Sequence, residues 1–219
     1  MNEIEISQRL INFLTFLPMF ILSITIHEFA HAFSASHLGD NTAQKLGRRT
    51  LNPLKHIDLI GTIIMPLASF ASGFALIGWA KPVPIDRRNF SRPRRDDAVV
   101  SFAGPFSNLL LSILFFIGYL IAINFDQTAQ LYYVSIFWYG VFFNVFLFLF
   151  NILPIPPLDG SHILYDIFPN KFTAGLLNLG LYGSILLLVF IYSPLWGFFR
   201  DLISFILSIF QSFERMING

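Results

Sequence analysis

The chain has no cysteine and few charged residues, which make up 12% of its 219 positions. Without cysteine there is no disulfide bond and no thiolate metal ligand, so any zinc site must use histidine and carboxylate side chains. The net charge of +1 gives no support for nucleic-acid binding, and we expect no nucleic-acid partner. The first residues also lack the basic stretch and small-residue cleavage site of a signal peptide, so we expect the first apolar segment to be retained.

Apolar residues are abundant instead, at 55% of the chain with 27 Phe. A soluble domain cannot bury so much apolar surface, and several segments approach or exceed the ~20 residues that cross a bilayer. We predict an all-α polytopic membrane protein in a lipid bilayer, with a single domain over residues 1–219. About five to six hydrophobic segments would surround a core of three helices. These segments are residues 8–37, 59–80, 98–124, 130–150, 172–192 and 195–213.

Two of these segments have a second interpretation. Residues 59–80 contain Pro66 and three glycines, and the loops on both sides are basic. The positive-inside rule places both loops in the cytoplasm, which favours a re-entrant segment, although the length also suits an ordinary spanning helix. Residues 195–213 carry Arg200 and Asp201 early, so this segment is either a crossing or a helix that lies along the membrane interface.

Residues 78–85 alternate proline with other residues, which excludes a helix. This pattern favours a small extended β element at a sheet edge, which could accept a peptide by strand addition. A rigid surface loop is the other interpretation.

A cluster of ionisable residues lies inside the first apolar segment. His27 and His31 are four residues apart, so on a helix they point the same way and can hold one metal ion. Glu28 lies about 100° around the helix axis from His27, close enough to touch a water bound to that ion. The pattern is typical of a zinc ligand pair with a general base. The alternative is that these side chains only hydrogen-bond neighbouring membrane helices.

A catalytic zinc ion usually has three protein ligands, so a third is needed. Asp159 is preferred, because it follows a proline-broken helix end where a carboxylate can lie within the membrane without facing lipid. Its other possible role is to cap the short helix that begins near Ser161. The remaining candidates are Asp40, Asp58, Asp86, Asp96, Asp97, Asp126, Asp166, Asp201, His37, His56 and His162.

Three motifs in order along the chain resemble the site-2 protease family of intramembrane zinc metalloproteases. They are His27-Glu28-Phe29-Ala30-His31, Gly104-Pro105-x-x-Asn108 and Asn151-x-x-Pro154-x-Pro156-x-Leu158-Asp159-Gly160. Residues 47–54 and 78–84 further resemble its short bacterial branch, which lacks PDZ domains. The likeness extends from about residue 20 to residue 165.

The resemblance implies a site for about one Zn²⁺ per chain, with His27, His31 and Asp159 as ligands and Glu28 activating water. It also implies that Asn108 and Asn151 lie near the site, where one or both could orient substrate or stabilise the oxyanion. The expected substrate is a single-span membrane protein, cut in or near its transmembrane helix by regulated intramembrane proteolysis.

The expected location is the inner (cytoplasmic) membrane, with the active site toward the cytoplasm. A metal or proton transporter and a non-catalytic protein that binds membrane helices are the alternative functions. The sequence names neither the substrate nor the oligomeric state.

Overall fold

The computed structural model describes residues 3–72, 78–124 and 127–218. Every regular element in these ranges is a helix, which confirms the all-α class. No strand occurs among them, so the β element at residues 78–85 stays a prediction. Asp126 and the middle of the 59–80 segment, residues 73–77, lie outside the described residues.

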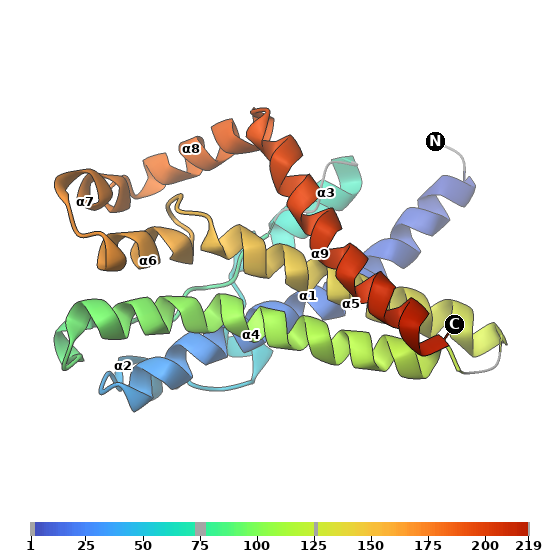
Figure 1. The fold of residues 1–219 in the computed structure, drawn as a ribbon, viewed down its shortest axis with the longest axis horizontal. Coiled ribbons are helices and arrows are strands. Elements are labelled where there is room, and N and C mark those ends of the chain that lie inside the picture. Colours follow the sequence, from blue (N-terminus) through green and yellow to red (C-terminus); the bar gives the residue numbers. More distant parts are fainter. Residues whose placement is uncertain (1–2, 73–77, 125–126, 219) are drawn as a thin grey trace.

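Three long helices run side by side and form the body of the protein (Figure 1). They are α1 (Glu3–His37), α4 (Pro93–Ala122) and α5 (Gln127–Ile152), and α4 packs against both of the others. Each contains a stretch long and apolar enough to cross a membrane. The protein is therefore a polytopic membrane protein built on three central helices.

Close packing holds these helices together, because burial from water supplies little driving force between helices that face lipid. Gly118 on α4 contacts the ring of Phe137, and Gly140 on α5 contacts Met19 and Phe115, with no space for a Cβ at either glycine. The last helix, α9 (Leu195–Asn218), crosses α5 and adds two buried side chains (Figure 1). The buried cluster contains Met19, Leu111, Phe115, Phe116, Val141, Val145, Phe199 and Ile203.

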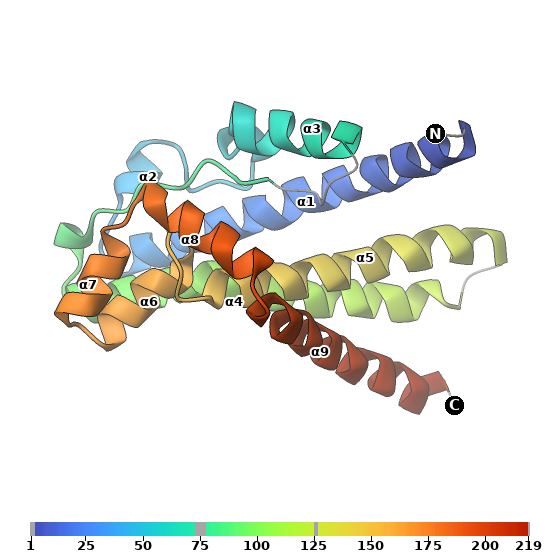
Figure 2. The ribbon, with the colours of Figure 1, turned by 90° about the horizontal axis from the view of Figure 1, so that it is seen from above.

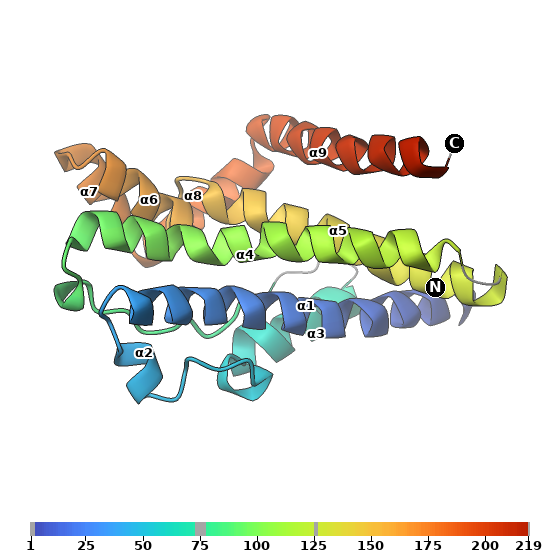
Figure 3. The same cartoon turned by 60° about the horizontal axis from the view of Figure 1, so that its bottom comes forward.

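The two described ends of the 59–80 segment lie close together. It begins with η2 (Leu59–Ile64), a π-helical stretch, and continues as α3 (Met65–Ser72), which lies on the side of α1 away from α4 (Figures 2 and 3). The N–H of Trp79 then donates to the Gly61 carbonyl at 3.1 Å. In a π-helix the Gly61 carbonyl would accept from the N–H five residues later. That residue is Pro66, which has no N–H, so the carbonyl is free to accept from Trp79. The meeting of both ends agrees with a re-entrant segment rather than a single crossing.

The crossing predicted at residues 172–192 is not one continuous helix. The chain forms α7 (Lys171–Leu177) and α8 (Leu181–Tyr192), whose axes differ by 95°. Gly180, at the break, has φ +53°, a value that side-chain-bearing residues rarely adopt. Counted as one bent span, the pair raises the candidate crossings among the described residues from three to four. α9 is not among them, in agreement with the interfacial alternative.

The short elements lie near the end of the bundle where α1 ends and α4 begins. α2 (Thr42–Lys45) follows α1, and α6 (Asp159–Ile167) follows α5 (Figure 1). Two single 3₁₀ turns, η1 (Pro53–Lys55) and η3 (Arg87–Asn89), lie in the loops before η2 and α4. α1 ends at His37, where the predicted segment 8–37 also ends, and Gly39 follows it at φ +108°.

Candidate metal centre

The fold brings His27 and His31 of α1 against Asp159, the first residue of α6. His27 Nε2 lies 3.2 Å from Asp159 Oδ2, and His31 Nε2 lies 3.4 Å from Asp159 Oδ1. One ligand atom of each residue lies within 4.8 Å of the other two, a spacing that suits one shared ion. Of the predicted third ligands, Asp159 is therefore the one that joins the histidine pair. No other candidate in the described ranges forms such a group.

The hydrogen bonds of the two imidazoles leave both Nε2 atoms ready for a metal. His27 Nδ1 lies 2.7 Å from Asn108 Oδ1, and His31 Nδ1 lies 2.7 Å from the Val100 carbonyl. Both partners are acceptors, so each Nδ1 donates, and a neutral imidazole then presents the lone pair of Nε2 to a metal. The two Nε2 atoms face each other at 3.0 Å. Two lone pairs at that distance repel, so this donor set fits a cation between them.

Glycine at position 104 keeps the space in front of these nitrogens open. A Cβ at Gly104 of α4 would lie 2.7 Å from His27 Nε2 and closer still to His31 Nε2. A second glycine, Gly160, lets α6 begin directly against the end of α5, because a Cβ there would collide with the Ile152 backbone. The two glycines thus provide the space for an ion and the approach of its carboxylate ligand.

Asn108 lies behind His27 rather than on the open side of the site. Its amide oxygen holds His27 Nδ1, and its Nδ2 donates to the Ser23 carbonyl at 3.3 Å and to Asn144 Oδ1 at 2.9 Å. Both of its N–H groups are therefore used, which leaves none for an oxyanion. In this structure Asn108 orients His27, which leaves Asn151 as the one of the two predicted asparagines with a role toward substrate.

Asn144 of α5 is a site residue that sequence reasoning missed. It is fully buried, accepts from Asn108, and donates from Nδ2 to Ser23 Oγ at 3.0 Å. The signal that singled out Asn108, a polar side chain in an apolar span, applies equally to Asn144.

Asn151 stands apart from this group. Its Nδ2 donates to the Leu147 carbonyl of the same helix at 2.9 Å, and its side chain is half-buried. Within the described part of the chain, no hydrogen bond joins Asn151 to Glu28 or to the three candidate ligands. The role of Asn151 toward substrate stays a prediction.

Glu28 is buried and held by a backbone group from a distant loop. Its Oε2 accepts from the N–H of Val83 at 2.7 Å. Val83 lies between Pro82 and Pro84, so it is the one residue of this triplet that has an N–H to donate. The loop that follows the 59–80 segment therefore contacts the candidate general base directly.

A second ionisable cluster fixes α6, and sequence reasoning did not find it. Asp166 lies seven residues after Asp159, about two helical turns, and so on the same face. It bonds the Arg87 guanidinium, whose Nε lies 3.3 Å from Asp97 Oδ2. Burial and the neighbouring Asp97 raise the pKa of Asp166 from 3.8 to about 7, although Arg87 opposes this shift. The cluster joins α6 to α4 and η3.

Replacing Asp166 by Asn should weaken the pH dependence of stability. A carboxyl group whose pKa is raised on folding stabilises fully below pH 3.8, and this contribution is lost as the pH rises through about 7. We expect the Tm of the wild type to fall by about 3 °C or more between pH 5 and pH 8 through this group. Asp166→Asn, which resembles the protonated form, should show a smaller fall by thermal unfolding in detergent. Asp201→Asn, at an exposed position on α9, is the control; equal slopes in all three proteins would contradict the assignment.

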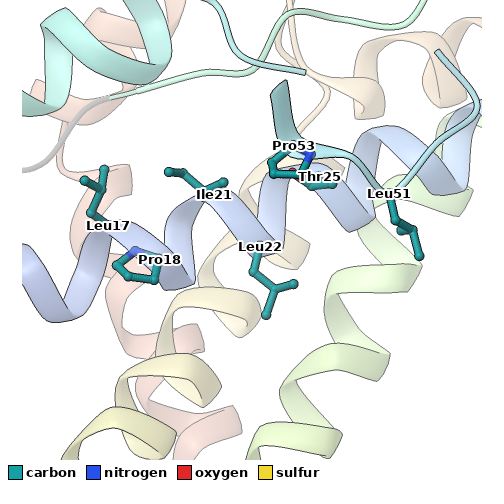
Figure 4. Close-up of a pocket in the computed structure, with 7 residues that line it drawn as sticks. All are labelled: Leu17, Pro18, Ile21, Leu22, Thr25, Leu51 and Pro53. Atoms are coloured by element: carbon teal, nitrogen blue, oxygen red, sulfur yellow. The ribbon is translucent and has the colours of Figure 1, made fainter. Parts of the chain in front are cut away.

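An apolar groove of about 360 Å³ lies along the part of α1 from Leu17 to Thr25 (Figure 4). The side chains of Leu51 and Pro53 form its other wall. Thr25 also lines it, and Thr25 Oγ1 is buried without a hydrogen-bond partner among the described residues. The helix-side lining is Leu17, Pro18, Ile21, Leu22 and Thr25.

Comparison with known proteins points to one family. The model described as "Peptidase family M50" matches residues 117–191, which include Asn144 and Asp159. "Putative zinc metalloprotease YwhC" of Bacillus subtilis (strain 168) is 42% identical over 188 residues, covering 81% of this chain and 80% of the relative. "Putative zinc metalloprotease Rip2" of Mycolicibacterium smegmatis is 30% identical over 187 residues, covering 83% of this chain and 68% of the relative.

An archaeal relative matches a smaller part. "Putative zinc metalloprotease MJ0611" of Methanocaldococcus jannaschii is 38% identical over 95 residues, covering 43% of this chain and 46% of the relative. No solved structure matches the chain. The names of these relatives and the His-His-Asp group agree on Zn²⁺ as the metal. Because the YwhC match covers most of both proteins, the chain belongs to peptidase family M50, the site-2 protease family.

Proposed function

We propose that this protein is an intramembrane zinc metalloprotease whose single domain spans residues 1–219. Its substrates are single-span membrane proteins, cut within or near the transmembrane helix in regulated intramembrane proteolysis. The observation that carries the proposal is the group formed by the buried His27 and His31 with the half-buried Asp159, with Glu28 next to His27 in the chain. Membership of a metalloprotease family favours this function over a transporter or a non-catalytic helix-binding protein.

The residues divide the chemistry among them. Zinc held by His27, His31 and Asp159 would supply a Lewis acid that polarises the scissile carbonyl and lowers the pKa of water. Glu28 takes the proton from the attacking water and passes it to the leaving amide nitrogen. Its second carboxylate oxygen, Oε1, has no hydrogen bond within the described ranges and is available for this transfer.

The oxyanion requires a donor that is not already occupied. Asn108 has no N–H left, because both serve Ser23 and Asn144. Asn151 is the remaining candidate of the two, and its amide would exchange the Leu147 carbonyl for the substrate oxygen. This exchange is part of the proposal.

A helical substrate must unwind before cleavage, because its carbonyls lie in intrahelical bonds. Residues 79–85 could hold it extended by strand addition. The N–H groups of Trp79, Lys81 and Val83 are bound within the protein, to Gly61, His56 and Glu28. Pro82 and Pro84 have no N–H, and the carbonyls of Trp79 and Lys81 accept from Thr62 and Arg48. A paired substrate would therefore mainly donate to the carbonyls of Ala80 and Pro84.

We place the site toward the cytoplasmic face of the inner membrane. The basic residues after α1 and those before α4 lie at the same end of the bundle (Figure 1). The positive-inside rule assigns that end to the cytoplasm. His31 lies six residues before the end of α1, about 9 Å along the axis from that end.

Cleavage of a synthetic single-span polypeptide in proteoliposomes tests the proposal. A fluorophore and a quencher on either side of its apolar segment report hydrolysis. We expect cleavage by the wild type, loss of cleavage after removal of metal with 1,10-phenanthroline, and recovery on addition of Zn²⁺. Cleavage that persists after the metal has been removed would contradict a zinc mechanism, and failure to cut any of a panel of such polypeptides would contradict the protease assignment.

A further inference from the structure

Arg48 is a buried cation without a carboxylate partner. Its side chain lies in the loop between α2 and η1 and is 8% exposed, and no carboxylate of the described chain pairs with it. Burying an unpaired guanidinium is costly, so its contacts must compensate. Arg48 Nη2 donates to the Lys81 carbonyl at 2.6 Å and to the Pro82 carbonyl at 3.4 Å. The charge is therefore directed at two successive backbone carbonyls.

The second of these carbonyls belongs to the peptide group that holds Glu28. The Pro82 carbonyl and the Val83 N–H are the two ends of one peptide unit, and Val83 N–H donates to Glu28 Oε2 at 2.7 Å. Hydrogen bonds at both ends of a peptide polarise it and strengthen each other. We propose that Arg48 is a positioning residue that fixes the Glu28 carboxylate through the Pro82–Val83 peptide. The inference rests on the proposed role of Glu28 in proteolysis.

The surrounding contacts explain why this loop can act on Glu28. On one side, Lys81 N–H donates to the His56 carbonyl at 2.9 Å. On the other, Asp86 N–H donates to Oδ2 of the fully buried Asp40 at 2.8 Å. Arg48 binds the middle of this loop, directly beside Val83. Residues 47–54 and 78–84 provide no metal ligand. The arrangement gives both stretches one structural role, which is to hold the loop that contacts Glu28.

The Val83 amide provides a readout that does not depend on activity. The chain has seven valines, so ¹⁵N-valine labelling gives a simple amide spectrum, and loss of a signal in Val83→Ile identifies Val83. We expect Arg48→Gln and Glu28→Gln each to shift the Val83 amide proton upfield and to speed its hydrogen exchange about tenfold or more. Arg49→Gln, at the exposed neighbouring arginine, is the matched control and should change neither. An unmoved Val83 signal in Arg48→Gln would overturn the proposal.

Kinetics with the single-span polypeptide test the consequence for catalysis. Arg48→Gln should lower kcat about tenfold to a hundredfold with KM changed less than about twofold, because a displaced catalytic group loses reactivity rather than affinity. Zinc content should stay at the wild-type value. Arg48→Lys should recover part of kcat, since the lysine keeps the charge and can still donate to a carbonyl, but it lacks the planar guanidinium.

Two results distinguish a failure of the positioning role from a failure of the proposed function. A wild-type kcat in Arg48→Gln, or a loss of kcat that follows a loss of zinc, would contradict the positioning role. Full turnover in Glu28→Gln would instead contradict the proposed function, while the Val83 amide would still show whether Arg48 holds the loop.

Discussion

Glu28→Gln is expected to abolish proteolysis while zinc stays bound. Glutamine has nearly the same shape and can still accept from the Val83 N–H, but it cannot take a proton from water. Glu28 is not among the three residues grouped around the metal position, so their geometry should be unchanged. We expect kcat to fall about 10³-fold or more, in the range found when a general base is lost. The measurement is cleavage of the single-span polypeptide, together with zinc analysis of the same preparation.

The matched control is Glu214→Gln, the same substitution on α9. It should leave both kcat and zinc content close to wild type. Near wild-type turnover in Glu28→Gln would end the general-base assignment. Loss of zinc in that variant would show instead that Glu28 is a ligand.

Gly104→Ala should empty the metal site without breaking a helix. The added methyl group would lie in front of both Nε2 atoms, 2.7 Å from that of His27. Alanine is favoured over glycine in a helix by about 1 kcal/mol, so helix propensity alone would stabilise the variant. We expect zinc content to fall from about one per chain to less than about a tenth, with activity lost in parallel.

Gly175→Ala on α7 is the control, because a Cβ there has no atom within 4 Å. Zinc content and activity of this variant should match the wild type. Thermal unfolding of both variants without added metal separates local blockage from misfolding. A Gly104→Ala protein that binds zinc normally would contradict the placement of the ion between α1 and α4.

Local periodicity was enough to predict the α1 half of the site. Residues four apart on a helix share a face whatever surrounds it, so His27 and His31 could be paired without knowledge of the fold. Asp159 required one further argument, that a carboxylate in the membrane must lie at a broken helix end. The structure places it against both histidines.

The contacts that position these residues join segments that are distant in the sequence. The spacing of residues along the chain could not predict them. Glu28 and Val83 are 55 positions apart, and their bond uses a backbone N–H, which carries no sequence signature. Asp97 and Asp166 are likewise brought together by the packing of α4 on α6. Such pairs depend on helix crossings that hydrophobic pattern alone does not determine.

One feature that was not predicted did have a local signal in the sequence. The break between α7 and α8 falls at Asn178-Leu179-Gly180, residue types that favour helix ends and turns, but the continuous apolar pattern on both sides dominated the prediction. Which of Asn108 and Asn151 could face the substrate was not predictable from the sequence, for another reason. The position of Asn108 near His27 was foreseen, but the number of its free N–H groups depends on Ser23 and Asn144.

The most direct test of the account is zinc content, measured by mass spectrometry on wild type and Asp159→Ala purified in detergent without chelators. Asp201→Ala, with an exposed aspartate on α9, is the control. The account predicts about one zinc per chain in the wild type and control, and loss or weakening of zinc binding in Asp159→Ala. A wild type that holds no zinc and takes none up, or an Asp159→Ala protein that binds zinc as tightly as wild type, would contradict it.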